Sequence, residues 1–581
     1  MHRLALLLVA FACAGSAPGV AATRPSPAVR RLVVVGINDT HGALLPAAAP
    51  RWTHGAAGGE IGGADWFGGY LDALRADAEE KGSAVVVVDA GDEFQGTLIS
   101  NQFQGRSVTE VYDALGVTAS AIGNHDFDFG LAVLQQRIAQ AKYAILAANV
   151  FRKGTRERPG WARPSVLVNA GGVRVGIIGL ATRETATVTN PVNVSGLDFA
   201  EGGPVAAQEA DALRARGATV VVIAAHAGPF GPDHEIQRIA RAVAGKVDAI
   251  VSGHQHAALG PPPMVVAGIP VVQSGSKLVS FSTVDLALDG EGRVRSFAVN
   301  QDALPRPGGP QAILHSWHGA PAVFRGRRVL PDARISAILG GYDEQVKALR
   351  ETRIGETTVD LRKGGADDLL ANLAADALRS GAGGGLRAQF ALQNSGGLRI
   401  TEIPAGPISF GQIFDLCPFD NEQVVLSLPA QTLRDALEAV LRAGKGPMRV
   451  SGLRYVIDWQ RFGAAEDPRR APAGAIVTRV VDEGGRPLCE TKSCTRTACE
   501  AACAPGPFTV SLADFLANGG DGLSMLEDLP RQTGSVLTRD IIVSWVKEHR
   551  PLTPELLGAL STGKRPRWIQ IGSPSRAQTG E

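Results

Sequence analysis

The sequence predicts an α/β fold made of more than one domain, and three observations support this. The chain has 581 residues, which is too long for one ordinary domain. Short apolar runs rich in β-branched residues recur in its first half, and stretches with helical periodicity lie between some of them. Most of these runs are followed within two residues by Gly, Asp, Asn or His. Such runs are typical of strands buried in an α/β sheet.

These runs place a layered α/β domain at residues 30–305. The predicted strands are Leu32–Ile37, Ala84–Val88, Val173–Leu180, Thr219–Ala225 and Ala249–Val251. The predicted helices between them include Trp66–Glu80 and Leu131–Ala141.

The rest of the chain is predicted to hold a linker and a second domain. Residues 303–332 are rich in Pro, Gly and Arg, which indicates a linker or an irregular insertion. Ala333–Arg350 has helical periodicity, so residues 306–350 are interpreted as a linker and a connecting helix. We expect a second, α+β domain over residues 351–572.

Residues 1–22 have the pattern of a secretory signal peptide. A short basic start is followed by the apolar run Leu4–Ala12, which is too short to span a bilayer, and Ala22 is placed for cleavage. The alternatives are a membrane anchor and a lipoprotein leader modified at Cys13. We therefore expect a periplasmic or secreted protein.

Charge and hydropathy exclude some classes of partner. Lys plus Arg number 58 and Asp plus Glu number 57, which indicates no basic surface for nucleic acid or for a membrane. No later apolar run reaches the roughly 18 residues of a membrane-spanning helix, so no stable membrane insertion is expected. The oligomeric state stays open.

Five cysteines follow the leader, and four of them lie close together in the sequence. The four are Cys489, Cys494, Cys499 and Cys503. In an exported chain such a cluster favours two disulfides, whose connectivity the spacing leaves open. A structural zinc site is the alternative, although the CxxC pairs typical of one are missing. Cys417 is predicted to be a small buried apolar side chain.

Residues that can bind metal ions gather where the predicted strands end. They come from five segments and are Asp39, His41, Asp92, Asn124, His226, His254 and His256. The carboxyl ends of strands in an open α/β sheet share one rim, so we expect these side chains to meet there. Oxygen and imidazole ligands without thiolates suit Mn, Zn, Fe or Co, and a carboxylate such as Asp92 can bridge two ions. Each motif alone is a weak signal, but the five in order predict a metal site.

The motifs also resemble those of a known family. NDTHG, AGDEFQG, GNHDFDFG, a histidine that ends a strand and GHQH occur in that order. They are similar to the calcineurin-like metallophosphoesterases, and more narrowly to the bacterial periplasmic 5'-nucleotidase/UDP-sugar hydrolase group. The resemblance implies a four-layer αββα sandwich and a centre with two divalent metal ions in the first domain.

The resemblance assigns the ligands to the two ions. It implies Asp39, His41 and His256 around one ion, Asn124, His226 and His254 around the other, and Asp92 as the bridge. Some relatives carry Gln where this chain has His256, which leaves the identity of the metal open.

His125 is expected to act on the transferred phosphoryl group and not as a ligand. In the family this histidine is oriented by the acid three residues further on, here Asp128. The residues themselves agree, because a histidine beside a metal ligand and near a carboxylate is suited to acid or electrostatic catalysis. Asp126 is interpreted as ordinary turn chemistry.

Three loops of the second domain resemble the substrate-binding loops of the family. They are Asn394–Arg399 (NSGGLR), Leu416–Asn421 (LCPFDN) and Phe515–Gly522 (FLANGGDG). The resemblance implies Phe419 and Phe515 on the two faces of a nucleobase, Asp521 on the ribose, and Asn394 and Arg399 on the substrate. Two aromatic faces suit a flat base. Arg362 is a further candidate, although the sequence after it is longer than expected.

These residues predict a secreted two-metal phosphohydrolase that removes the 5'-phosphate from nucleotides, with UDP-sugars as an additional candidate substrate. Alternatives on the same scaffold are a cyclic-nucleotide phosphodiesterase, a nucleotide pyrophosphatase and a sulfate-ester hydrolase, and the pair Phe419 and Phe515 disfavours the last. A metal-dependent surface binding protein without turnover is the alternative from another class. The intact His125 and the full ligand set disfavour it.

Overall fold

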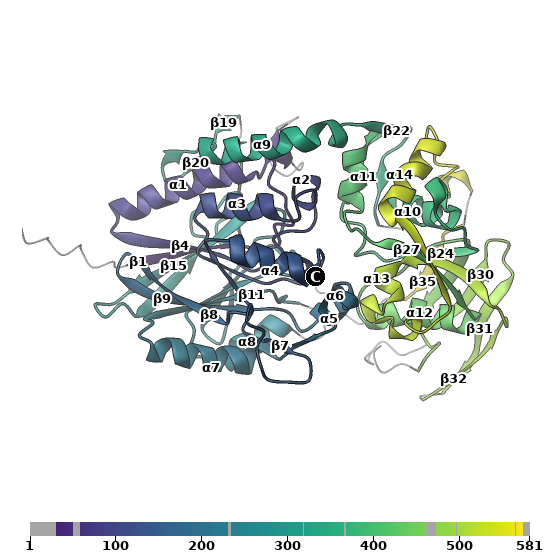
Figure 1. Ribbon diagram of the computed structural model, residues 1–581, viewed down its shortest axis with the longest axis horizontal. Coiled ribbons are helices and arrows are strands. Elements are labelled where there is room, and N and C mark those ends of the chain that lie inside the picture. The colour runs from purple at the N-terminus through teal and green to yellow at the C-terminus, as the bar shows by residue number, and fades with distance from the viewer. Residues whose placement is uncertain are drawn as a thin grey trace, which may run out of the picture.

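A computed structural model describes the chain at residues 31–49, 59–230, 234–317, 319–364, 368–460, 472–495, 497–563 and 565–572. The expected signal peptide, Cys13 included, lies outside the described residues. The chain forms two lobes that lie side by side (Figure 1). Within the described ranges, no helix combines the length and the apolar character needed to cross a membrane.

Two sheets form the centre of the first lobe, in the strand orders β16-β15-β1-β4-β5-β6, with β17 beside β15, and β13-β14-β12-β11-β9-β8. The strands of the first sheet are β1 (Arg31–Ile37), β4 (Ser83–Asp89), β5 (Ala119–Ala121), β6 (Ala144–Leu146), β15 (Ser280–Leu288), β16 (Val294–Val299) and β17 (Gln311–Ala312). Those of the second are β8 (Ser165–Ala170), β9 (Val173–Leu180), β11 (Val220–Ala225), β12 (Ala249–Ser252), β13 (Met264–Val266) and β14 (Ile269–Val272). The segments β1-β4-β5-β6 and β9-β11-β12-β14 run parallel.

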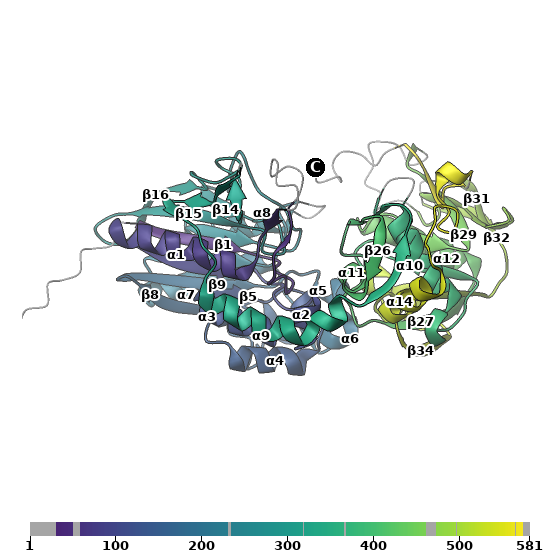
Figure 2. The same ribbon diagram turned by 90° about the horizontal axis from the view of Figure 1, so that it is seen from above.

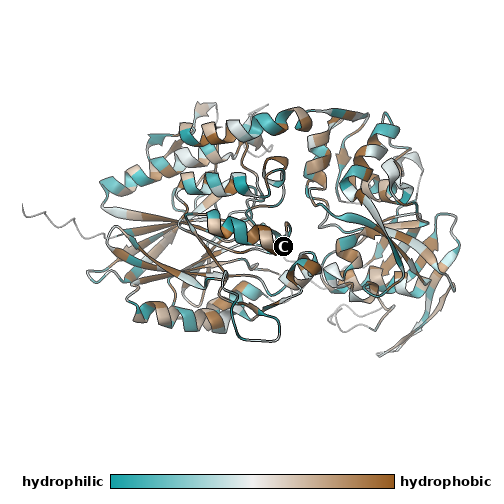
Figure 3. Cartoon of the chain, in the orientation of Figure 1, coloured by the Kyte–Doolittle hydropathy of each residue, from teal (hydrophilic) through white to brown (hydrophobic). Residues whose placement is uncertain are grey.

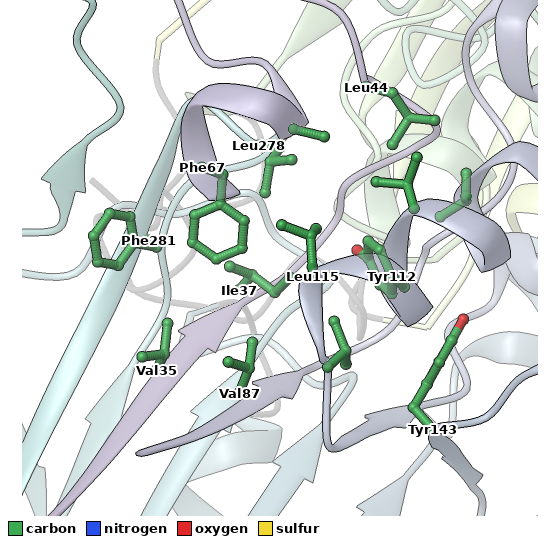
Figure 4. Close-up of a cluster of buried hydrophobic side chains, with 14 of the residues drawn as sticks. Val35, Ile37, Leu44, Phe67, Val87, Tyr112, Leu115, Tyr143, Leu278 and Phe281 are labelled. Carbon is green, nitrogen blue, oxygen red and sulfur yellow. The ribbon is translucent and has the colours of Figure 1, made fainter. Parts of the chain in front are cut away.

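Helices cover the outer face of each sheet, so the lobe has four layers. Alternate residues of β1 face opposite sides: Val34 lies in the buried cluster between the two sheets, and Val35 lies in the cluster under the helices. The first sheet is covered by α1 (Ala64–Glu80), α3 (Arg106–Leu115) and α4 (Leu131–Gln140), and Figure 4 shows Phe67 of α1 beside Phe281. The second sheet is covered by α7 (Gly202–Ala215) and α8 (Glu235–Ala242). Figure 3 shows teal and brown residues alternating along these helices. The αββα sandwich is confirmed.

Residues 303–332 were expected to be a linker or an irregular insertion, and much of this stretch packs onto the first lobe. It contains the short strand pairs β18 (Ser316–Trp317) with β19 (Ala320–Pro321) and β20 (Val323–Phe324) with β21 (Arg327–Arg328). Ile313, Phe324 and Val329 are buried in the cluster under the helices. Pro and Gly interrupt these apolar residues, so no strand period is visible in the sequence. The connecting helix has the expected bounds, since α9 is Ala333–Arg350, and it lies along α1 and α3 (Figure 2).

The second lobe contains two five-stranded sheets, in the orders β28-β24-β33-β27-β34 and β32-β31-β30-β29-β35. The first comprises β24 (Phe390–Gln393), β27 (Glu422–Leu428), β28 (Arg449–Ser451), β33 (Phe508–Ala513) and β34 (Arg531–Leu537). The second comprises β29 (Leu453–Asp458), β30 (Val477–Asp482), β31 (Pro487–Cys494), β32 (Cys499–Cys503) and β35 (Trp568–Ile571). One core holds α10 (Leu369–Ser380), α11 (Phe410–Leu416) and α14 (Thr538–Glu548), and another holds α12 (Ala430–Arg442).

The four clustered cysteines form two disulfides across the hairpin of β31 and β32. Cys489 pairs with Cys503, and Cys494 pairs with Cys499. Each pair joins residues directly opposite each other in the antiparallel ladder. No sulfur of the cluster is left for a zinc ion, and Cys417 is buried and free.

Denatured, unreduced protein that lacks residues 1–22 is expected to show one titratable thiol per chain, that of Cys417. Titration with a dithiobis(nitrobenzoate) reagent measures it, and reduction should raise the count to five. The variant Cys417→Ser is the matched control and should show none before reduction. Five thiols in the unreduced protein would contradict both disulfides.

Candidate active site

The expected metal ligands all lie just beyond the carboxyl ends of strands. The first sheet supplies Asp39 and His41 after β1, Asp92 after β4 and Asn124 after β5, and the second supplies His226 after β11 and His254 and His256 after β12. Side chains that are more than 200 residues apart in sequence make contact there, such as His41 and His256. The two sheets therefore deliver these residues to one rim of the sandwich.

The backbone at this rim is held in an unusual conformation. Asp39, His41, Asp92, His254 and His256 have positive φ values of 49°, 49°, 59°, 77° and 54°. A residue other than glycine in this region costs about 1–3 kcal/mol, and such residues concentrate at functional sites. The strands and their contacts hold these loops in place against that cost.

Two groups of side chains in the cluster can each hold a divalent ion. One is Asp39, His41 and His256, and the other is Asp39, Asp92 and His226, with the ligand atoms of each group within 4.8 Å of one another. Oδ2 of Asp92 lies 3.7 Å from Nε2 of His41 and 3.2 Å from Nε2 of His226. Asp92 therefore faces both groups, as a bridging ligand must. Asn124 belongs beside the second group, since its Oδ1 lies 3.0 Å from Nε2 of His226.

Backbone carbonyls orient two of the imidazoles. Nδ1 of His41 lies 2.9 Å from the carbonyl oxygen of Gln95, and Nδ1 of His226 lies 2.9 Å from that of Ala90. A ring that donates from Nδ1 keeps Nε2 free for a metal. Burial, and then the charge of Arg399, lower the pKa of His41 and that of His256, the latter to about 3. Both imidazoles are therefore neutral, which is the form that binds a metal.

The buried acids also fit a cation. Burial raises the pKa of Asp39 to about 7. Burial alone would lower the pKa of His226, but Asp92 and Asp39 outweigh it and raise that pKa to about 10. Buried carboxylates are costly without a compensating positive charge. A divalent ion among these three residues would supply that charge in place of the proton on His226.

His254 stands apart from the other expected ligands. Its ring centroid lies 5.1 Å from that of His226, but its Nε2 lies 3.7 Å from Oε2 of Glu184. It belongs to neither of the two groups above. Its backbone N–H donates to both carboxylate oxygens of Asp39 at 3.0 Å, which holds its loop against the cluster.

His125 and Asp128 form a pair beside the cluster. Nδ1 of His125 lies 2.7 Å from Oδ2 of Asp128, and the backbone N–H of His125 donates to Oδ1 of Asp92 at 2.8 Å. Burial alone would lower the pKa of His125, but Asp128 and Asp92 outweigh it and raise that pKa. The pair can hold a proton on the imidazole at the edge of the cluster.

Asp126 has a larger role than the turn that the sequence indicates. Its carboxylate is buried and accepts hydrogen bonds from the backbone N–H groups of Asp92 at 3.1 Å, Glu93 at 2.8 Å, Phe94 at 3.3 Å and Gly123 at 2.8 Å. It therefore ties the loop of Asp92 to the loop of Asn124. Gly123 allows the close approach, because a Cβ there would lie 2.2 Å from Oδ1 of Asp92.

A cavity of about 320 Å³ lies between the lobes and joins the cluster to the second lobe. Its lining includes His125 and Asp128 and all five expected substrate residues, Asn394, Arg399, Phe419, Phe515 and Asp521. Nη2 of Arg399 lies 3.0 Å from Nε2 of His41, so this guanidinium reaches the metal-ligand cluster. Nδ2 of Asn394 donates to Oδ2 of Asp521 at 2.7 Å, which orients that carboxylate.

The two phenylalanines reach the cavity from different elements. Phe419 follows α11, and its ring centroid lies 5.4 Å from that of His125 and 5.7 Å from the guanidinium of Arg399. Phe515 belongs to α13 (Asp514–Ala517). A Cβ at Gly520 would lie 2.4 Å from the Phe515 ring, so glycine is needed where the FLANGGDG loop folds over it.

Arg362 does not belong to the site, and this expectation was wrong. Its exposed side chain pairs with Asp360 and Glu402. The next residue is the one that reaches a substrate loop: Nζ of Lys363 donates to the carbonyl oxygens of Ser395 at 2.8 Å and of Leu398 at 2.6 Å. Because the sequence after Arg362 is longer than expected, the basic residue near the substrate loop was assigned one position too early. A shift of one residue along a strand turns a side chain to the opposite face.

Sequence reasoning also missed residues that line the cavity. They include Gln95, Thr189, Asn190 and Lys445. Gln95 is buried, and neither polar atom of its side chain has a partner among the described residues. The only signal for Gln95 was its place inside the AGDEFQG motif, and Thr189 and Asn190 lie in no motif.

Comparisons with known proteins agree with this two-lobed site. Residues 32–258 match the family model of the calcineurin-like phosphoesterases, and residues 351–528 match that of the 5'-nucleotidase C-terminal domain. A snake venom 5'-nucleotidase from Gloydius brevicauda is 28% identical, over 91% of this chain and 88% of its own length.

Solved structures share the fold of both lobes. A 5'-nucleotidase precursor from Thermus thermophilus is 27% identical with a TM-score of 0.74, covering 94% of this chain and 100% of that chain. A sulfate thiohydrolase from the same species is 18% identical with a TM-score of 0.69, covering 95% and 99%, and shows the fold alone. With a phosphoesterase lobe, a 5'-nucleotidase C-terminal lobe and relatives of the same arrangement, this chain belongs to the 5'-nucleotidase family of metal-dependent phosphoric monoester hydrolases.

Proposed function

We propose that this chain removes the 5'-phosphate from nucleotides with two divalent ions, in the periplasm or outside the cell, and that UDP-sugars are a second class of substrate. Asp39, His41 and His256 would hold one ion, Asn124, His226 and His254 would hold the other, and both ions would share Asp92. One observation carries the proposal. A single cavity has the metal-ligand cluster and His125 at one end and two phenylalanine faces in its lining, as a molecule with both a phosphate and a base requires.

The residues of the chain have distinct roles in this proposal. When bound, divalent ions at such a site polarise the phosphoryl group and activate the attacking water. Arg399, which reaches His41 at 3.0 Å, binds the phosphoryl oxygens, and the unpartnered amide of Gln95 is a further donor. His125, held at Nδ1 by Asp128, gives a proton from Nε2 to the leaving 5'-oxygen.

The second lobe binds the nucleoside. Phe419 and Phe515 stack on the base, and Asp521 accepts hydrogen bonds from the ribose hydroxyls. The bond from Asn394 keeps the Asp521 carboxylate turned into the cavity. A sulfur substrate would need neither the aromatic faces nor this carboxylate.

Hydrolysis of a panel of substrates tests the proposal, measured as phosphate release for the monoesters, as p-nitrophenol for the aryl ester and by chromatography of the products for the others. The panel contains AMP, UMP, UDP-glucose, NAD, 2',3'-cyclic nucleotides and bis-p-nitrophenyl phosphate, each with added Mn, Co, Zn or Mg. We expect AMP and UMP to be hydrolysed faster than the cyclic nucleotides and the diester, and a reversed order would contradict the proposal. Export predicts a mature protein that begins at Thr23, which N-terminal sequencing after expression of the full chain can detect.

Phe515→Ala is expected to lower kcat/KM for AMP by about 5- to 150-fold, the effect of removing one stacking face. The same variant should barely change the hydrolysis of p-nitrophenyl phosphate, which has no base. Steady-state kinetics on both esters, with circular dichroism to check folding, measure the difference. Phe419→Ala should lower both activities, and that of AMP more, because its ring lies next to His125 and Arg399.

Phe297→Ala is the matched control, since Phe297 lies exposed on β16 and outside the cavity lining, and it should change neither activity. An equal loss on both esters in Phe515→Ala would mean that this ring only packs the fold. No loss on either ester would mean that the base is recognised elsewhere.

A further inference from the structure

The segment Glu184–Val194 follows β9 and contains the short helices α5 (Thr185–Val188) and α6 (Pro191–Val194). Both helices lie where the first lobe meets the second (Figures 1 and 2). No motif covers the segment. It nevertheless contacts the catalytic pair on one side and the second lobe on the other.

On the catalytic side, the segment holds Asp128 and Asn124. Oγ1 of Thr189 donates to Oδ1 of Asp128 at 2.8 Å, while Oδ2 of the same carboxylate binds Nδ1 of His125 at 2.7 Å. The carbonyl oxygen of Val188 accepts Nδ2 of Asn124 at 3.2 Å, which leaves Oδ1 of that amide on the metal-ligand cluster. Thr189 lines the cavity but is buried, so little of its surface is open to competing water.

On the other side, the segment contacts the loop that carries Phe515. Nδ2 of Asn190 donates to Oδ2 of Asp514 at 3.0 Å, and Asp514 is the first residue of α13. Nζ of Lys445 lies 2.9 Å from Oε2 of Glu184. Helix α5 also contacts the turn Gly520–Gly522, which contains Asp521. Two consecutive residues, Thr189 and Asn190, therefore bind opposite lobes.

We propose that Thr189 and Asn190 are positioning residues that make the orientation of His125 depend on the docking of the second lobe. The inference rests on the proposed function, because the proposed function makes His125 the proton donor. With the bond from Asn190 to Asp514 in place, the neighbouring Thr189 is fixed and holds Asp128 in the rotamer that binds His125. Without it, Thr189 is released, Asp128 loses one of its two side-chain bonds, and the imidazole is less well oriented.

The interface between the lobes is suited to such a dependence. The contacts described across it include hydrogen bonds, such as Asn101 to the carbonyl oxygen of Pro418 at 2.9 Å and Lys277 to that of Arg399 at 3.2 Å, and a small apolar cluster in which Phe414 joins Leu98 and Ile99. Domains whose interface is partly polar can move relative to each other. A substrate held by both lobes would stabilise the docked arrangement, and with it the productive orientation of His125.

The test uses p-nitrophenyl phosphate, which has no base for the second lobe to bind. Thr189→Val, which exchanges the hydroxyl for a methyl group, should lower kcat by about 10- to 100-fold, the loss typical when a partner that orients a functional side chain is removed. Thr189→Ser keeps the hydroxyl and should restore most of kcat. KM and metal content should stay close to those of the wild type. Thr187→Val is the matched control, because Thr187 is exposed in the same segment and its hydroxyl bonds only to the carbonyl oxygen of Glu184.

Asp514→Ala supplies the decisive comparison, since Asp514 is outside the cavity lining and far in sequence from the catalytic pair. It should lower kcat for p-nitrophenyl phosphate by about 5-fold, the effect of losing one hydrogen bond. Asp514→Asn keeps an acceptor oxygen and should restore the rate. In the double variant with Thr189→Val, the two losses should not multiply, because both act through one contact chain.

Three results would overturn the inference. They are an unchanged kcat for the ester in Asp514→Ala, losses that multiply in the double variant, and equal losses in Thr189→Val and Thr189→Ser with a lowered Tm. A failure of the proposed function can be distinguished from a failure of this inference. If the wild type hydrolyses p-nitrophenyl phosphate but no nucleotide, the nucleotide assignment is wrong, and the Thr189 and Asp514 variants can still be compared on that ester.

Discussion

Replacing His125 by alanine is expected to lower kcat by about 10²- to 10⁴-fold, the usual contribution of a positioned acid or base, while the metal content stays that of the wild type. The reason is geometric. His125 contacts the cluster through its backbone N–H, which donates to Asp92 at 2.8 Å and survives the substitution. Its side chain contacts Asp128 and belongs to neither group of metal-binding side chains.

The measurement combines turnover of AMP with elemental analysis of the same samples. Asp128→Asn should lose less than His125→Ala, because it removes the orienting charge and leaves the imidazole in place. His549→Ala is a control outside the cavity, since His549 stacks on Trp545 in the second lobe, and it should keep full activity. A His125→Ala protein whose remaining activity follows a reduced metal content would show that His125 is a ligand.

Asp92→Asn should weaken both metal sites at once and lower activity by more than about 100-fold, the upper end of what outer partners of a metal site contribute. Oδ2 of Asp92 lies 3.2 Å from Nε2 of His226 and 3.7 Å from Nε2 of His41. Both groups of metal-binding side chains therefore share the negative charge of Asp92. The amide keeps the shape and removes that charge. The wild type should contain about two metal ions per chain after purification without chelators.

Metal content and activity are compared across a titration with Mn or Co. Asp128→Asn is the matched control, because it neutralises a neighbouring acid that is no ligand, and its metal content should equal that of the wild type. Loss of one ion alone in Asp92→Asn would show that Asp92 binds a single site. A wild type that takes up no divalent ion under any of these conditions would contradict the metal assignment as a whole.

Strand positions were predictable because they depend on local pattern. Val173–Leu180 was predicted as a strand and has those bounds in the structure, and Leu32–Ile37 differs from β1 by one residue. A continuous apolar run with polar residues at its end is enough to indicate a buried parallel strand. Ala333–Arg350 was predictable for a similar reason, since its helical period is uninterrupted. Residues 303–332 were predicted as a linker or an irregular insertion, and their packing was not visible in the sequence because their buried apolar side chains follow no period.

The candidate site was predictable only where function depends on short motifs. All the expected ligands lie at strand ends, and the expected substrate residues line one cavity. Arg362 was misplaced because a one-residue difference decides which cation reaches the substrate loop Asn394–Arg399. Asp126 was underrated, since a buried carboxylate that binds four backbone N–H groups looks like any turn aspartate in a sequence.

The sequence by itself determined the αββα sandwich, the types of metal-binding side chain at the carboxyl ends of its strands and the family of the chain. Each of these depends on residue type and on spacing along the backbone. Only the tertiary structure decided which side chains meet across the two lobes. Arg399 reaches His41, Asn190 reaches Asp514, and the cysteines pair as Cys489 with Cys503 and Cys494 with Cys499. Such contacts depend on how separately folded units pack against each other. Local propensity carries no record of that packing, since the partners lie hundreds of residues apart or on facing strands whose register only the fold defines.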